Sequence, residues 1–240
     1  MTMKKANIFL TAEWRKLAIA NYPVDPILLR PFLPHNTELD IWENKCYVSL
    51  IGFMFLNTRL KSFRIPFHSN FEEVNLRFYV RYKENGIWKR GVTFIKEIVP
   101  KPAITFFANT LYNEKYETLR MSHSWIIDEK YLNIEYQWKN RNWNSFKLKA
   151  ENVSIPIKIN SEEDFITEHY WGYSKINNSQ TTEYGVEHPR WNSYQLIDYS
   201  INVDFGDVYG KQFAFLSEVK PYSVMLAEGS EILIRSGNKI

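Results

Sequence analysis

Hydrophobic and polar residues alternate along most of this chain, a pattern that favours β-strands over helices. The clearest case is a hairpin in which Glu72–Tyr82 and Trp88–Val99 are joined through Glu84-Asn85-Gly86, with Asn-Gly at its tip. Other strands are predicted at Trp14–Val24, Leu39–Trp42, Cys46–Leu56, Thr118–Ile127, Tyr131–Trp138, Phe146–Val153, Tyr170–Lys175, Thr182–His188, Ser193–Val203, Gln212–Leu216, Ser223–Ala227 and Glu231–Arg235. The pattern therefore predicts a mainly antiparallel β protein.

Helical signals are few and short. Pro100 precedes the strongest, Lys101–Tyr112, which carries Ile104, Phe107, Ala108 and Leu111 on one face. Asp25 can cap a brief helix that Pro31 stops, and Ser161 can cap another that ends near Glu168. Because no linker, repeat or shift in composition interrupts the chain, we expect a single α+β domain over residues 1–240.

Composition narrows the classes of partner. The 240 residues are 45% apolar and 24% charged with a net charge of +3, and no basic tail or arm is present, which disfavours nucleic acid. No apolar stretch approaches the roughly 20 residues of a membrane-spanning helix, and the apolar run near the start is too short for a signal peptide. The single Cys46 rules out an internal disulfide. We expect a cytoplasmic protein without membrane contact, and the sequence leaves homo-oligomerisation open.

Metal and nucleotide sites have no support in the motifs. The five histidines show no HExxH and no i,i+4 pair on a helix, and neither a glycine-rich phosphate loop nor a GxSxG elbow occurs. We therefore predict no metal and no cofactor. Aromatic residues make up 16% of the chain, which suits both an aromatic β core and a concave ligand site.

Two strands place charged residues beside apolar ones. In Phe71–Val80 the residues Val74, Leu76, Phe78 and Val80 form a core face, while Glu73, Asn75, Arg77 and Tyr79 point the other way. That second face is either solvated or the polar wall of a ligand cavity. In the next strand, alternation puts Lys96 with Val92 and Phe94, and Glu97 with Thr93 and Ile95. A buried lysine could act as a nucleophile or base, although charge pairing across strands is the simpler explanation.

Several longer strings resemble a known family. They are Asn21-Tyr22-Pro23-Val24-Asp25-Pro26, Leu29-Arg30-Pro31-Phe32-Leu33-Pro34, Phe67-His68-Ser69-Asn70-Phe71-Glu72-Glu73-Val74-Asn75-Leu76-Arg77, Thr167-Glu168-His169-Tyr170-Trp171-Gly172 and Val186-Glu187-His188-Pro189-Arg190-Trp191. Together they resemble the bacterial YqjF-like family of uncharacterised proteins over nearly the whole chain. That family is similar to acetoacetate decarboxylase, so the resemblance implies a cone-shaped antiparallel β-barrel with a few short helices and an interior pocket.

The decarboxylase site carries over only in part. In that enzyme a lysine forms a Schiff base with a β-keto acid. The reaction requires an amine whose pKa is lowered, so that it is unprotonated and nucleophilic at neutral pH. The resemblance places Arg15 at the substrate-carboxylate arginine, Glu72 or Glu73 at one pocket glutamate, and Tyr116 at the Schiff-base lysine. Lys115 is one residue away, which on a strand means the opposite face.

These observations lead to one principal function and two alternatives. The first is a protein that binds or transforms a small carbonyl, carboxylate or aromatic compound. Its acid/base or amine candidates are Glu72, Glu73, Lys96, Lys115 and Tyr116, and its ligand-binding candidates are Arg15, Asn75, Arg77, His169 and Trp171. If it is an enzyme, we expect lyase-like or proton-transfer chemistry. The alternatives are a non-catalytic binding protein for a hydrophobic metabolite or xenobiotic, and a structural β domain that binds a partner.

Overall fold

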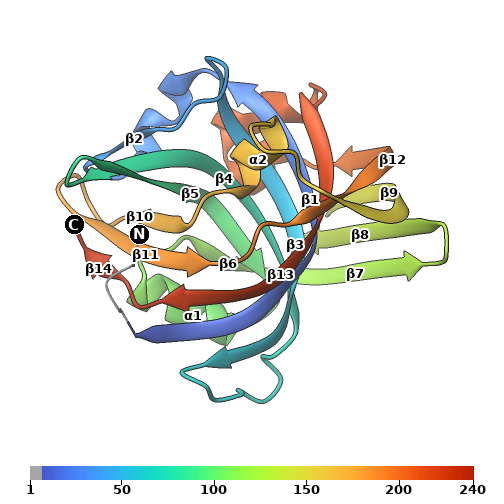
Figure 1. Ribbon diagram of the computed structural model, residues 1–240, viewed down its shortest axis with the longest axis horizontal. Coiled ribbons are helices and arrows are strands. Elements are labelled where there is room, and N and C mark those ends of the chain that lie inside the picture. The colour runs from blue at the N-terminus through green and yellow to red at the C-terminus, as the bar shows by residue number, and fades with distance from the viewer. Residues whose placement is uncertain (1–6) are drawn as a thin grey trace.

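The computed structural model describes residues 7–240, and within them one 14-stranded sheet carries most of the secondary structure (Figure 1). The strands are β1 (Ile8–Val24), β2 (Thr37–Leu39), β3 (Cys46–Leu60), β4 (Phe71–Glu84), β5 (Ile87–Val99), β6 (Tyr116–Thr118), β7 (Arg120–Ile127), β8 (Tyr131–Lys139), β9 (Trp143–Pro156), β10 (Trp171–Lys175), β11 (Thr181–Glu187), β12 (Asn192–Asn202), β13 (Ser223–Arg235) and β14 (Asn238–Lys239). The helices are α1 (Pro102–Leu111), α2 (Glu162–Thr167) and α3 (Phe205–Tyr209), with 3-10 turns η1 (Pro26–Leu28), η2 (Arg30–Phe32) and η3 (Lys211–Ser217).

The sheet curves back on itself. Its order is β14-β11-β10-β5-β4-β3-β1-β13-β12-β9-β8-β7, and β11 also pairs with β13 through Val186↔Ile234. This closes a ring of strands, while β12, β9, β8 and β7 continue beyond it as a separate wing (Figure 1). Nearly all pairings are antiparallel, the exceptions being those of β5 with β10 and with β6. The predicted mainly antiparallel β fold with a few short helices is therefore confirmed.

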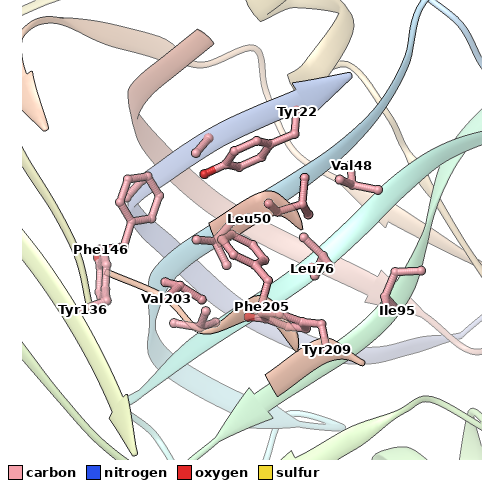
Figure 2. Packing of buried hydrophobic residues seen from close by; sticks show 14 of the residues in the cluster. Tyr22, Val48, Leu50, Leu76, Ile95, Tyr136, Phe146, Val203, Phe205 and Tyr209 are labelled. Carbon is pink, nitrogen blue, oxygen red and sulfur yellow. The ribbon is translucent and has the colours of Figure 1, made fainter. Parts of the chain in front are cut away.

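Two apolar clusters lie on opposite faces of the central strands. The apolar face of β4 (Val74, Leu76, Phe78 and Val80) packs with the wing strands β8 and β9 and with α3 and η3. Figure 2 shows part of this cluster, in which Tyr136 and Phe146 of the wing lie together and Leu76 of β4 lies close to Phe205. The other face of the same strands packs Ile19, Ile51 and Phe53 with α2. Because both faces are covered, any polar residue on either face must find a partner within the protein.

The local predictions mostly agree with the structure. The helix at Lys101–Tyr112 appears as α1, the Ser161 hydroxyl caps α2, and the hairpin turn places Asn85 and Gly86 at positive φ. The strand predicted at Gln212–Leu216 is wrong, because this segment is the 3-10 helix η3. A 3-10 helix has three residues per turn, so Phe213 and Leu216 lie on one buried face. Over so short a segment this spacing resembles the alternation of a β-strand.

A bulge in β5 changes which residues share a face. Leu76 pairs with Lys96 and Arg77 pairs with Phe94, so Ile95 has no partner on β4. As a result Val92, Phe94 and Glu97 lie on one face, whereas Ile95, Lys96 and Ile98 lie on the other. The prediction that Lys96 shares a face with Val92 and Phe94 is therefore wrong, because strict alternation ignores the extra residue.

Candidate functional site

The polar face of β4 (Glu73, Asn75, Arg77 and Tyr79) is buried rather than solvated. Glu73 and Asn75 are each 2% exposed, and the Asn75 amide donates a hydrogen bond to Glu73 Oε1 at 2.9 Å. The Arg77 guanidinium donates to the Ile166 carbonyl at 3.2 Å, while its Nε has no partner. The Glu73 carboxyl accepts its hydrogen bonds from two neutral donors, the Asn75 amide and the Tyr116 hydroxyl.

The β5 bulge adds a second carboxyl beside the first. Asn75 pairs with Glu97 across the two strands, and Glu97 is also 2% exposed. Its Oε2 is buried without a hydrogen-bond partner. An unpartnered carboxyl oxygen in the interior costs free energy, so it marks a place where a proton or a ligand can be accommodated.

The segment after α1 supplies the other polar groups. Strand β6 pairs in parallel with β5 and places Tyr116 beside Glu97. The Asn109 side chain holds Tyr116 through hydrogen bonds to the backbone N–H and carbonyl of Tyr116. The Tyr116 hydroxyl donates to Glu73 Oε2 at 2.9 Å. Two residues earlier, Glu114 accepts a hydrogen bond of 2.7 Å from the Tyr184 hydroxyl on β11. We call Glu73, Glu97, Glu114, Tyr116 and Tyr184 the carboxyl cluster.

Burial and mutual repulsion make these carboxyls weak acids. Burial raises the pKa of Glu73 to about 7, against the opposing hydrogen bonds from Asn75 and Tyr116. Burial, followed by repulsion from Glu114 and Glu73, raises the pKa of Glu97 well above its ordinary value. Burial also raises the pKa of Glu114. The three groups titrate as one coupled system, and the cluster holds protons at neutral pH.

An apolar cavity of about 180 Å³ ends at this cluster. Among its walls are Phe55 and Phe71 on the strands and Ile104, Phe107 and Ala108 on α1. Its polar lining includes Glu97, Glu114, Tyr116 and Tyr184. A cavity of about 150 Å³ lined by apolar side chains can hold benzene, so this one suits a small aromatic or branched aliphatic body. The cluster can donate and accept protons near neutral pH at one end of that body.

Glycine at position 172 makes room for one member of the cluster. A Cβ at Gly172 would lie 2.1 Å from Cζ of Tyr184, far inside van der Waals contact. We expect Gly172→Ala to lower the free energy of unfolding by about 1–3 kcal/mol and to displace the Tyr184 hydroxyl from Glu114. Chemical denaturation measures the first effect. Gly86→Ala is the control for backbone strain alone, because its added Cβ meets open space while its φ of +83° costs alanine about 1–2 kcal/mol; a loss in Gly172→Ala that does not exceed this strain would contradict the packing role.

Most other residues predicted for the site lie elsewhere. Glu72 is on the apolar face of β4 and contacts His123 Nδ1 at 2.6 Å, and Lys96 pairs with Glu117 at 2.7 Å. Lys115 points away from its neighbours Glu114 and Tyr116, and its Nζ lies 4.8 Å from the centre of the Phe32 ring. Arg15 pairs with Glu13 at 2.6 Å. In the part of the chain described, the cavity lining contains no lysine or arginine.

His169 and Trp171 belong to other contacts. His169 Nε2 lies 3.2 Å from Asp40 Oδ2, and burial lowers the pKa of the imidazole to about 4. Trp171 stacks beneath the Lys89 ammonium, 4.1 Å from the ring centre. The structure thus brings Glu73, Asn75 and Tyr116 together and leaves Glu72, Lys96, Lys115, Arg15, His169 and Trp171 outside their group. Over residues 7–240 there is also no set of three or more His, Cys, Asp or Glu side chains arranged to hold a metal ion.

Sequence reasoning missed Glu114 and Tyr184 as site residues. Glu114 sits in the stretch Tyr112-Asn113-Glu114-Lys115-Tyr116 that was compared with the decarboxylase lysine, and alternation alone puts it on the same side as Tyr116. Tyr184 offers no such signal, because only the folded sheet brings β11 to the end of α1.

Three comparisons place this geometry among known proteins. The DUF2071 family, described as an uncharacterized conserved protein, matches residues 11–231. The uncharacterized protein YqjF of Bacillus subtilis (strain 168) is 28% identical over 183 residues, which are 74% of this chain and 72% of that protein.

Solved structures show the same fold at low identity. An acetoacetate decarboxylase from Legionella pneumophila has a TM-score of 0.66 at 12% identity, over all of this chain and 90% of that one. The enduracididine biosynthesis enzyme MppR complexed with pyruvate has a TM-score of 0.64 at 9% identity, over 99% of this chain and 92% of that one. Within the described residues, no helix is both long enough and apolar enough to cross a membrane.

Proposed function

This chain belongs to the DUF2071 family of uncharacterized conserved proteins, and we propose that it binds a small, largely apolar molecule in the cavity beside α1. One observation carries the proposal: apolar walls of the cavity converge on Glu97, Glu114, Tyr116 and Tyr184 at one end. Cavities with this distribution of apolar surface and few polar groups are typical ligand sites. Support also comes from the fold, since a protein with the same fold, MppR, is complexed with pyruvate.

The lining narrows the ligand classes that the sequence left open. An aromatic or carbonyl compound fits, because the walls are apolar and the cluster offers phenol and carboxylic acid donors. A carboxylate does not, because Arg15 and Arg77 are absent from the lining and the nearest polar groups are themselves carboxyls. Schiff-base chemistry has no amine in the lining to begin it, since Lys96 and Lys115 both point elsewhere.

Fluorine NMR with para-fluorophenethyl alcohol tests the binding proposal. The compound is neutral, so its affinity reports the cavity rather than the charge of the head group. We expect saturable broadening and a shift of the fluorine signal at a ratio of one ligand per chain. An unchanged signal with millimolar ligand would overturn the proposal.

A further inference from the structure

The polar end of the cavity gathers acidic groups, and no lysine or arginine among the described residues lines it. The charged or titratable groups on the elements packed around it are Glu73 and Arg77 from β4, Glu97 from β5, Tyr112, Glu114 and Lys115 from the segment after α1, Tyr116 from β6, Lys175 from β10, Tyr184 from β11, and His68 from the loop before β4. Both nearby lysines are engaged on the far side, Lys115 over the Phe32 ring and Lys175 on the Pro31 carbonyl. Arg77 donates to the Ile166 carbonyl and does not line the cavity.

Glu97 differs from the other two carboxyls of the cluster in the hydrogen bonds that it accepts. Its side chain lines the cavity, is almost fully buried, and has an Oε2 with no partner. The neighbouring carboxyl oxygens of Glu114 accept from Tyr184, and those of Glu73 accept from Tyr116 and Asn75. Glu97 lies in contact with Glu114 and Tyr116 at the end of the cavity, where a donor carrying positive charge would relieve the repulsion among the three carboxyls.

We propose that the cavity selects an organic ammonium compound, in which a primary amine bonds Glu97 and Glu114 while a small aromatic or branched aliphatic body lies against Phe71 and Ile104. This proposal rests on the proposed function and adds the charge of the ligand to it. An ammonium has three donors and no acceptor, which matches carboxyl and phenol oxygens. A carboxylate ligand would add a fourth acid to the cluster, and an alcohol would supply one donor without charge.

Proton release follows from this arrangement. Glu97 and Glu73 hold protons in the empty cluster, and an ammonium favours their ionised forms, so binding sends a proton from the cluster to solvent while the amine keeps its own. Affinity for the amine should therefore rise with pH, by up to about tenfold per pH unit where one proton is released. A carboxylate ligand would show the opposite slope, and a neutral ligand would show a shallow one.

Three probes with one ring and different head groups test the proposal on the whole protein: para-fluorophenethylamine, para-fluorophenethyl alcohol and para-fluorophenylacetate. We expect the amine to bind at least about tenfold more tightly than the alcohol at pH about 7.5, with an affinity that falls as the pH is lowered to about 6. Glu97→Gln should remove this preference and flatten the pH dependence, and measurable binding of the alcohol to the variant reports that the cavity is intact.

Glu117→Gln is the matched control, because Glu117 pairs with Lys96 outside the cavity and should leave all three affinities unchanged. If the alcohol or the carboxylate binds as tightly as the amine, the ammonium proposal is overturned and the binding proposal stands. If none of the three binds, the binding proposal itself falls.

Discussion

Glu73→Gln is expected to be more stable than the native protein at pH about 8, by about 3 kcal/mol in the free energy of unfolding. The folded protein raises the pKa of Glu73 from 4.5 to about 7, and each unit of that difference corresponds to about 1.4 kcal/mol. Between these two values the folded state holds a proton that the unfolded chain has lost, so stability falls as the pH rises. Glutamine resembles the protonated acid and does not carry this penalty.

The measurement is urea denaturation of both proteins from pH about 4.5 to about 8. The difference between their free energies of unfolding should be small at the acidic end and should grow through the interval up to pH 7. Glu72→Gln is the neighbouring control: His123 lowers the pKa of Glu72 against the effect of burial, so the pair stabilises the protein above the ordinary pKa and is lost in acid. That variant should be less stable than the native protein near neutral pH, by less than about 1 kcal/mol. If the free energies of unfolding of the native protein and Glu73→Gln change with pH in the same way, the raised pKa of Glu73 is contradicted.

Ala108→Trp is expected to reduce the affinity for para-fluorophenethyl alcohol at least about a hundredfold, because an indole attached to α1 would occupy most of a cavity of about 180 Å³. Enlarging a packed residue costs about 1–3 kcal/mol, and the free space of the cavity keeps the cost at the lower end of that range. Titration followed by fluorine NMR measures the affinity, and denaturation measures the cost.

Thr110→Trp provides the comparison, since Thr110 is exposed on the same helix and does not line the cavity. It should bind the alcohol as the native protein does. Ala108→Leu fills less of the space and should give an intermediate loss, which keeps the test decisive if the tryptophan variant folds poorly. Retained affinity in both Ala108 variants would place the ligand elsewhere.

The polar face of β4 shows what can be predicted from the alternation of residues along one strand. Alternation alone separated Glu73, Asn75 and Arg77 from Val74 and Leu76, and the structure has the same division. Alternation did not reveal whether the polar side was solvated, because burial depends on α2 and β6, which come from distant parts of the chain. The face was predictable from neighbours in sequence, and its environment was not.

The positions of Glu97 and Glu114 could not be predicted from local sequence patterns, and each has a physical reason. The bulge at Ile95 places Glu97 on the same face as Phe94, and no residue type in the strand predicts a bulge at this position. Glu114 joins the cluster only because β6 pairs in parallel with β5, a contact that follows from the path of α1 rather than from any hairpin. The family resemblance predicted that Tyr116 and either Glu72 or Glu73 belong to one site, and the Tyr116 hydroxyl indeed donates a hydrogen bond to Glu73.

Carbon-13 NMR of the glutamate carboxyl groups, followed as a function of pH, tests most directly the claim that the cavity ends in carboxyls that hold protons at neutral pH. We expect Glu73 to titrate with a midpoint near 7, Glu97 to titrate well above the ordinary glutamate value, and Glu72 to titrate below that value. Midpoints below about 5 for every glutamate would contradict this claim, because carboxyls of ordinary acidity are ionised at neutral pH and hold no proton.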